Sequence, residues 1–232
     1  MRKSINGHTR RAIPRQTLPA AVAERLREKI LRGEFGAGEP LRQHAIADEF
    51  AVSRIPVREA FRQLEAEGLI QIQDHRGAIV TALSPEEIEE LFEMRAALES
   101  VTLRRAVPQL TAEDIERAEQ ALQAYEHALH EETDIDVWGE LHWQFHSILY
   151  AASHRSRSLA LIQTLNTNAD RYIRLHILFS HEAHRHAQDE HRAILELCRQ
   201  RKAKAASQLL EQHITKAGRE LKEFIKRQPK TE

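Results

Sequence analysis

Apolar residues near the start of the chain recur at the spacing of an α-helix. Val22, Leu26 and Ile30 follow one another every four residues, and Gly33 supplies a stop signal. A second short helix is predicted from about Leu41 to Phe50. A third starts at Ser53 as its cap, ends at Gly68 and carries one apolar face, formed by Val57, Ala60, Phe61 and Leu64.

At Leu69 the hydrophobic period changes to two. The stretch LIQIQ alternates apolar with polar residues, DHRG favours a turn, and AIVTA returns as a second apolar run, which together predict a β-hairpin. Three short helices followed by a hairpin are typical of a winged helix-turn-helix, in which the helix after the turn enters the major groove of DNA and the hairpin touches the flanking backbone. We therefore expect residues 17–82 to form such a DNA-binding domain.

The rest of the chain, residues 84–228, keeps helical periods and shows no strand alternation. SPEE is a compact helix start, with Ser84 as the cap, Pro85 at the first helical position and Glu87 able to return the capping hydrogen bond. TAED, from Thr111, is another. Breaks between helices are expected near residues 108, 133, 154, 181 and 201. The predicted fold is mainly α: a winged helix-turn-helix followed by an all-helical bundle domain.

The two predicted domains differ in charge, although the chain of 232 residues has a formal net charge of only −1. Residues 1–82 contain 14 Lys and Arg against 10 Asp and Glu, whereas residues 83–232 contain 20 against 25. The first part can approach a polyanion such as DNA, and the second has no such bias.

Neither a membrane span nor a signal peptide is predicted. No apolar run approaches the ~18 residues that a span needs, and residues 1–15 lack the apolar core of a signal sequence. We therefore expect a soluble, cytoplasmic protein. The single cysteine, Cys198, cannot form an internal disulfide and lies among apolar residues, so buried packing is expected rather than redox chemistry.

Residues 1–16, MRKSINGHTRRAIPRQ, contain five Lys or Arg and no acid. With so little that can pack, this stretch is expected to be a mobile basic arm. It could touch DNA or act only as a solubilising tail, and the sequence leaves both interpretations open.

Arg54, Arg58 and Arg62 are spaced four residues apart along one flank of the third predicted helix. A solvated charged face is the ordinary explanation of such a stripe. The preceding turn, the following hairpin and the basic balance of residues 1–82 favour DNA recognition instead.

Histidines of the helical half lie at positions that share a face with apolar residues. In LHWQFHSILY, His142 and His146 are one turn apart beside a core stripe that includes Phe145, and two imidazoles so spaced can share one metal ion. His191 and His213 fall within the apolar stripes of two later helices. Buried imidazoles on three helices suggest a common divalent cation, although the lining of a polar effector pocket would also explain them. Four others are expected at the surface, with a weak extra metal site as the alternative: His176, His181, His184 and His186.

Two other classes of protein fit less well. A metal-dependent hydrolase of the zinc-protease kind would need Glu directly after its first histidine, where this chain has Trp143. We find no Ser/His/Asp or Cys/His nucleophile set and no phosphate-binding glycine loop, so an enzyme is not expected. A pure interaction module would explain the helical bundle but not the DNA-reading half.

The segment VSRIPVREAFRQLEAEGLI followed by HRGAIV resembles the signature of GntR-family bacterial transcription regulators. In that family two arginines at the start of the recognition helix contact operator DNA, which implies this role for Arg54 and Arg58, and the wing-tip glycine corresponds to Gly77. A further contact usually comes from an arginine where this chain has His44, so neighbouring Arg42 could substitute for it. The same helix and the wing add two more expected DNA-binding residues: Arg62 and Arg76.

The second half resembles the all-helical effector domain of the FadR-type GntR subfamily, the FCD domain, in which a D-x-x-x-H pair and two later histidines bind a metal. His146, His191 and His213 match the three histidines, whereas His142 takes the place of the acid. A neutral ligand in place of a carboxylate leaves the site one negative charge poorer, which favours Zn²⁺ or Ni²⁺ over Mn²⁺.

The metal of such domains commonly assists an organic acid effector, so the resemblance implies that a small carboxylic acid is sensed. Arg171 and Arg174, one turn apart in RYIRLHIL, could pair with its carboxylate or could belong to a solvated face. Members of the family are most often repressors. A homodimer is expected because one winged helix reads too few base pairs, and two half-sites of the operator solve that problem.

Overall fold

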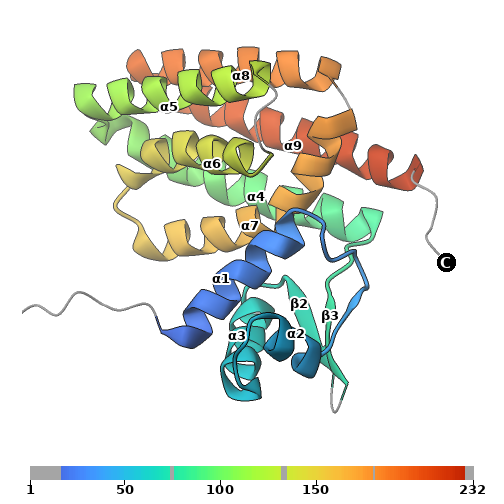
Figure 1. The fold of residues 1–232 in the computed structure, drawn as a ribbon. Helices are drawn as coiled ribbons and strands as arrows, with labels where there is room; N and C mark the ends of the chain where they lie inside the picture. Colours follow the sequence, from blue (N-terminus) through green and yellow to red (C-terminus); the bar gives the residue numbers. More distant parts are fainter. Residues whose placement is uncertain (1–16, 74–75, 132–134, 180, 228–232) are drawn as a thin grey trace, which may run out of the picture.

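A computed structural model describes residues 17–73, 76–131, 135–179 and 181–227, and Figure 1 shows them as a ribbon. The expected basic arm at residues 1–16, the hairpin turn at 74–75 and the expected break near residue 133 lie outside these ranges. Within helices, the side chains of residues 135–136, 171, 175–179 and 181–185 are not described either.

The N-terminal body contains the three predicted helices and a small sheet. In chain order it comprises α1 (Leu18–Leu31), β1 (Pro40–Leu41), α2 (Gln43–Glu49), α3 (Arg54–Ala66), β2 (Ile70–Gln73) and β3 (Gly77–Val80). The apolar faces read from the sequence close on one another, and Leu26, Phe61 and Leu64 are completely buried in a core that belongs to this body alone. This arrangement confirms the winged helix-turn-helix.

The sheet has one strand more than the predicted hairpin. Its order is β1-β3-β2 with both pairings antiparallel, and Leu41 lies opposite Ala78. The second predicted helix is confirmed as α2, but it starts at Gln43 rather than at about Leu41, because Pro40 and Leu41 pair with β3. A strand of two residues has no alternation that sequence reading could detect.

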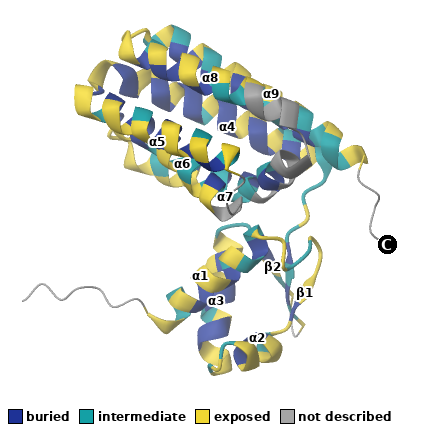
Figure 2. Cartoon of the chain, turned by 45° about the horizontal axis from the view of Figure 1, so that its top comes forward, coloured by how far each residue is buried: buried dark blue, intermediate teal, exposed yellow. Residues whose placement is uncertain are grey.

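The C-terminal body is an all-helical bundle, as predicted. It comprises α4 (Pro85–Ala106), the short 3-10 helix η1 (Val107–Gln109), α5 (Ala112–His130), α6 (Ile135–Ala151), α7 (Ser156–Phe179), α8 (His181–Arg199) and α9 (Ala203–Arg227). Ser84 and Thr111 both form capping boxes, so both predicted helix starts are confirmed. Figure 2 shows that the buried faces of these helices turn towards one another.

The bundle has its own hydrophobic core, which includes completely buried Phe145, Leu149 and Tyr150 on α6. Cys198 is also completely buried, and burial raises the pKa of its thiol to about 12, in agreement with a packing role. Across the described residues, no helix is long and apolar enough to cross a membrane.

The two bodies meet along α7. Helix α1 of the N-terminal body contacts α7, and Figure 1 shows α1 between the rest of its body and the bundle. In the connecting segment, the Leu83 backbone N–H donates to the Tyr172 hydroxyl at 2.7 Å. Gly68, which follows α3, approaches Asn168 so closely that a Cβ there would meet the Asn168 side chain at 2.9 Å.

Candidate DNA interface and metal centre

The predicted recognition helix α3 presents its arginines to solvent. Ser53 occupies the N-cap position with an extended backbone, as predicted, but within the described chain its side chain makes no capping hydrogen bond. The Arg58 and Arg62 side chains are 54% and 62% exposed, and each lies near Glu59. Arg54 is exposed as well. Because the opposite face of α3 is buried in the core, the three arginines are held on the side of the helix that faces solvent.

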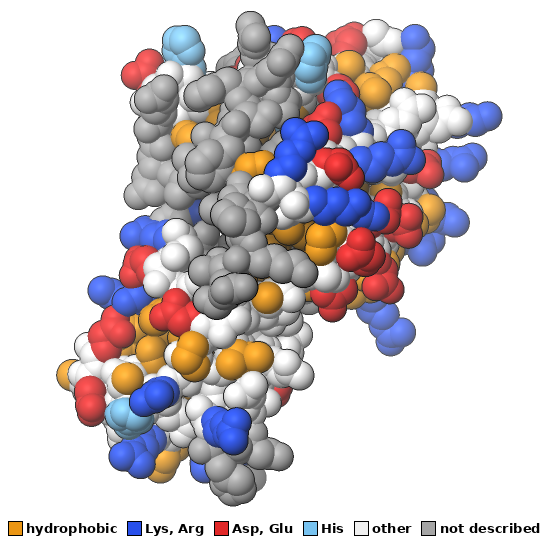
Figure 3. Space-filling model, turned by 90° about the vertical axis from the view of Figure 1, so that its right-hand side faces the viewer, with side chains coloured by type: hydrophobic (Ala, Val, Ile, Leu, Met, Phe, Trp, Pro, Cys, Tyr) orange, Lys and Arg blue, Asp and Glu red, His pale blue; other side chains and the backbone are white. Residues whose placement is uncertain are grey.

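The predicted DNA-binding residues line one open groove between α3, the start of α2 and the wing. Its volume is about 690 Å³, and its described lining contains no acidic residue. Figure 3 shows basic side chains at the lower end of the molecule, where the N-terminal body lies. All seven expected residues contribute to it: Arg42, His44, Arg54, Arg58, Arg62, Arg76 and Gly77.

Gly77 explains how β3 of the wing comes so close to β1. Its φ is +96°, in the left-handed region that favours glycine, and a Cβ at this position would clash with the Leu41 carbonyl oxygen. The missing side chain lets β1 approach β3, and Arg42 follows β1 directly. Arg42 and Arg76 therefore reach the same groove although they are far apart in the sequence.

In the bundle, the four predicted histidine ligands converge. His142 and His146 come from α6, His191 from α8 and His213 from α9, and one ring nitrogen of each lies within 4.8 Å of the others. His146, His191 and His213 are buried, while His142 is half-buried. Three separate helices thus bring four imidazoles to one point.

The spacing of the rings fits a common cation. The Nε2 atoms of His146 and His191 are 3.2 Å apart. Two nitrogens bound to one ion at 2.0–2.1 Å are about 2.8 to 3.4 Å apart, for bond angles between a right angle and a tetrahedral one. His191 Nδ1 is buried and has no hydrogen-bond partner among the described residues, so no described protein group satisfies this nitrogen.

Hydrogen bonds fix which nitrogen of His146 carries its proton. The Tyr150 hydroxyl donates to Glu99 Oε2 at 2.7 Å and lies 3.2 Å from His146 Nδ1. A phenol has one proton, so Nδ1–H of His146 must donate to the Tyr150 oxygen. Nε2 then keeps its lone pair, which is the state that a metal ligand requires.

His213 is oriented in the same way by a carboxylate. Its Nδ1 lies 2.6 Å from Glu190 Oε2, and Lys216 lies 3.1 Å from the other oxygen of Glu190. These two partners, with the hydrogen bond to His213 as the largest cause, lower the pKa of Glu190 to about 2. An ionised carboxylate can only accept, so Nδ1 of His213 donates and its Nε2 is free to bind a cation.

Burial favours the neutral form of three of the four rings. It lowers the pKa of His142 to about 3, with smaller contributions from nearby Arg95 and His213. Burial is also the largest cause of the pKa values of His146 and His191 falling well below the usual range. The rings of His142, His146 and His191 can therefore act as neutral ligands at physiological pH.

Sequence reading missed the polar residues beside the histidines. Arg95 and Glu99, one turn apart on α4, are only 3% and 2% exposed and form an ion pair of 2.9 Å. Tyr150 links this pair to His146. The available signal was a charged pair within the apolar stripe of α4, where Phe92 and Leu103 are buried.

Arg174 lies in a different place from the one expected of an effector ligand. Its guanidinium pairs with Asp170 at 2.6 Å, is buried, and lines a hollow between α1, α6 and α7 to which none of the four histidines contributes. The side chain of Arg171 lies outside the described residues. An effector-binding role of these two arginines stays a prediction.

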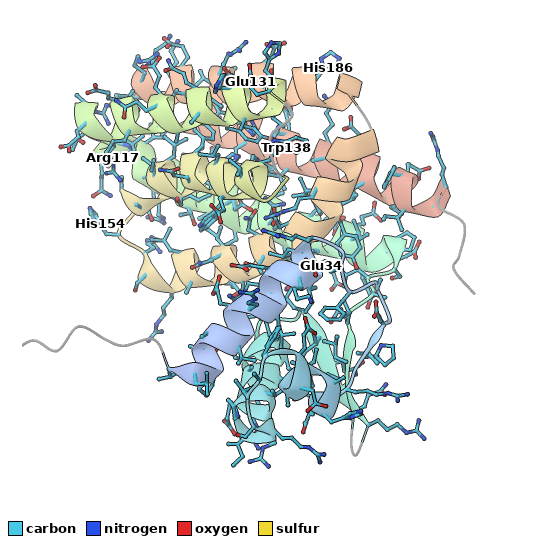
Figure 4. The ribbon with its side chains drawn as sticks, viewed as in Figure 1. Glu34, Arg117, Glu131, Trp138, His154 and His186 are labelled. Carbon is cyan, nitrogen blue, oxygen red and sulfur yellow. The ribbon has the colours of Figure 1, made fainter. Side chains whose placement is uncertain are left out.

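Of the four histidines expected at the surface, His186 is exposed, and Figure 4 shows it on α8 at the outer edge of the bundle. The side chains of the other three lie outside the described residues: His176, His181 and His184.

Comparison with protein families matches both halves of the chain. Residues 18–80 match the family described as bacterial regulatory proteins, gntR family. Residues 90–216, more than half of the chain, match the FCD domain. Both matches agree with the two bodies seen in the fold.

Individual relatives cover most of the chain. The HTH-type transcriptional repressor RspR of Escherichia coli (strain K12) is 32% identical over 158 residues, which are 68% of this chain and 69% of RspR. The uncharacterized HTH-type transcriptional regulator YdhC of Bacillus subtilis (strain 168) is 28% identical over 200 residues, 86% of this chain and 89% of YdhC.

A solved structure has the same architecture. The putative transcriptional regulator GntR from Rhodococcus sp. RHA1 is 26% identical, with a TM-score of 0.73 over 88% of this chain and 96% of that one. These relatives are regulators rather than enzymes, as the sequence led us to expect. The chain therefore belongs to the GntR family of bacterial DNA-binding transcription regulators, with the FCD domain of the FadR-type subfamily as its second domain.

Proposed function

We propose that this protein is a ligand-responsive, dimeric repressor that senses a small carboxylic acid at a metal centre in its helical domain. A repressing role is supported by the name of its relative RspR. Because operator DNA lies in the cytoplasm of a bacterial cell, we expect the protein to act there.

The arginine-lined groove supports DNA binding by α3 and the wing. Arg54 and Arg58 would contact base edges or phosphates from α3, and Arg42, His44 and Arg76 would hold the backbone on either side. Operator specificity calls for two copies on two half-sites.

The single observation that carries the sensing role is the convergence of four imidazoles within 4.8 Å. His142, His146, His191 and His213 would hold one divalent cation, and an all-nitrogen set favours Zn²⁺ or Ni²⁺ over harder ions. When bound, the cation would supply positive charge that attracts the carboxylate of an effector.

Arg95 is the best candidate for a second anchor of that carboxylate. It is buried, and its positive charge is close enough to lower the pKa values of His142 and His146. The bond to Glu99 uses one of its five N–H donors, and a guanidinium can hold a carboxylate with two parallel hydrogen bonds.

A chain of contacts leads from the histidines towards the DNA-binding body. Gly139 lies one turn before His142 on α6, and a Cβ there would clash with Arg174 and crowd Asp170 on α7. Arg174 and Asp170 line the hollow that α7 shares with Arg27 of α1. A shift of α6 on effector binding would therefore move α7 and change the contact between the two bodies.

The test combines metal analysis with an operator mobility-shift assay. Purified protein should contain close to one divalent ion per chain, and His191→Ala should lose the ion while the exposed His127→Ala keeps it. Chelation should lower the thermal midpoint, because an ion bound only by the folded state stabilises that state.

Folded protein that binds operator but holds no metal and ignores both chelator and added Zn²⁺ or Ni²⁺ would overturn the metal centre. The protein would then be a metal-free regulator with histidines lining a polar effector pocket. Hydrolysis, the other alternative, gains no support from the relatives, which are regulators.

A further inference from the structure

Ile55 is the most exposed large apolar side chain among the described residues, at 65%. It lies in the first turn of α3, directly after Arg54. The other end of α3 leads to Gly68, which contacts Asn168 of the bundle, so the first turn lies at the end of the helix away from the bundle (Figure 1). An isoleucine left so open gains little from burial within the chain itself.

Ile55 faces directly away from the hydrophobic core. At 3.6 residues per turn, its direction is nearly opposite to the mean direction of the buried residues of α3. Those buried residues are Pro56, Val57, Ala60, Phe61 and Leu64. Arg58 and Arg62, three and seven residues further along, share the face of Ile55. The face that carries exposed arginines therefore has an apolar residue at its start.

The surroundings of Ile55 are basic. Arg54, directly before it, and Arg58, one turn after it, both line the groove of about 690 Å³. Glu59 is an acid on the same face, but its carboxylate lies 3.1 Å from Arg62 and 3.9 Å from Arg58, so two arginines offset its charge. A surface of this kind attracts a polyanion, and the first turn of a recognition helix is the part that contacts base edges. Operator DNA is therefore the partner that fits Ile55.

We propose that Ile55 recognises the C5-methyl group of a thymine in the major groove, beside the base pairs that Arg54 and Arg58 contact. This methyl is the apolar group that distinguishes one base from the others in the major groove. The remaining distinguishing groups are hydrogen-bond donors and acceptors, and an isoleucine over them would displace water without replacing its hydrogen bonds. Ile55 thus favours thymine over cytosine, which lacks the methyl and carries an amino donor.

The inference rests on the proposed role of α3 as the recognition helix and adds a sequence element to the operator. Arginine most often pairs with guanine in the major groove. Each half-site should therefore contain a thymine next to a guanine, and the same pair should recur in the other half-site because two copies bind symmetrically.

The test begins with selection of binding sites from random duplex DNA by the full-length protein. Each thymine of the selected sequence is then replaced in turn by deoxyuridine, which lacks only the C5-methyl group. One of these replacements, made in both half-sites together, should weaken binding about tenfold or more, because each lost methyl contact is worth about fourfold. Fluorescence anisotropy with the labelled duplex measures the affinity.

Ile55→Ala completes the cycle. Alanine keeps the helix but is too short to reach the methyl group, and the exposed site leaves the thermal midpoint unchanged. This variant should bind the thymine and deoxyuridine duplexes with affinities that agree within about twofold. The matched control is Leu18→Ala, which removes a 54% exposed side chain from α1 and should keep the discrimination of the parent protein.

Two results would overturn the thymine contact. One is a parent protein that is indifferent to every replacement by deoxyuridine, and the other is an Ile55→Ala variant that discriminates as well as the parent does. Arg54→Ala on the same duplexes separates either result from a failure of the proposed function. Weaker binding by Arg54→Ala would then leave α3 as the recognition helix and remove the role of Ile55 alone.

Discussion

The imidazole of His213 and the carboxylate of Glu190 form a hydrogen bond of 2.6 Å between Nδ1 and Oε2. The two residues lie on different helices, α9 and α8. Glu190 precedes His191 in the sequence, so α8 supplies both one candidate metal ligand and the residue that orients another.

Replacing Glu190 with Gln should weaken binding of a divalent metal about 10–100-fold, because the charge that fixes the ring of His213 and raises its basicity is lost. Isothermal titration with Zn²⁺ measures the effect. The matched control is Asp189→Asn, which removes a neighbouring carboxylate that pairs with Arg192. Equal affinities for the two variants would contradict an orienting role.

His142→Asp should keep a metal site but change its preference. A carboxylate oxygen would replace an imidazole nitrogen, and harder ions such as Mn²⁺ favour oxygen ligands. We expect the ratio of Mn²⁺ to Zn²⁺ affinity to rise relative to the parent protein in competition titrations. An unchanged ratio would show that position 142 does not contact the ion.

The metal-free protein should lose stability as the pH falls below about 6.5. The buried imidazoles have folded pKa values below the ordinary 6.5, with His142 at about 3, so the unfolded chain takes up protons that the folded chain does not. The free energy of unfolding then falls by up to about 1.4 kcal/mol per pH unit for each such histidine.

Urea denaturation in chelator at pH 7 and pH 5 measures this loss. The carboxylate of Glu190 contributes little to this difference, because its folded pKa of about 2 and its ordinary value of 4.5 both lie below that interval. His146→Gln should show a shallower dependence than the parent protein. Equal stability of the parent protein at both pH values would contradict the neutral, buried state.

Arg54→Ala and Arg58→Ala should each weaken operator binding without changing the thermal midpoint, because both side chains are exposed. The loss is roughly 1–3 kcal/mol if the arginine makes a bidentate contact to a base. Arg25→Ala is a matched control, since Arg25 is also exposed but does not line the groove. Unchanged affinity for operator DNA in both α3 variants would contradict the proposed interface.

Gly77→Ala should destabilise the DNA-binding body and leave metal binding intact. A left-handed backbone costs an alanine roughly 1–2 kcal/mol, and the clash of its Cβ with the Leu41 carbonyl oxygen adds to that cost. Calorimetry should show a lower midpoint together with weaker operator binding. Gly33 also has a positive φ, of +76°, with nothing within 4 Å of a Cβ, so Gly33→Ala separates backbone strain from the clash.

The sequence by itself determined the local features of this protein: where helices start, which of their faces are apolar, and where the wing lies. The helix starts at Ser84 and Thr111 depend on side chains that bond to backbone three residues away, so a four-residue motif is enough to place them. The apolar faces of α1 and α3 follow from helical period, and the alternation from Leu69 identifies the wing. The motif around Arg54 and Arg58 identified the family for the same reason, since it lies in one short segment.

Only the tertiary structure decided which distant residues meet. The pairing of Pro40 and Leu41 with β3 joins segments far apart in the chain and leaves no local period. The four histidines are suggestive by type, but their approach within 4.8 Å depends on how α6, α8 and α9 pack. Packing also buried Arg95 near the histidines and placed Arg174 in the hollow that α7 shares with α1. The environment of a charged side chain is set by the neighbouring elements as well as by its own helix.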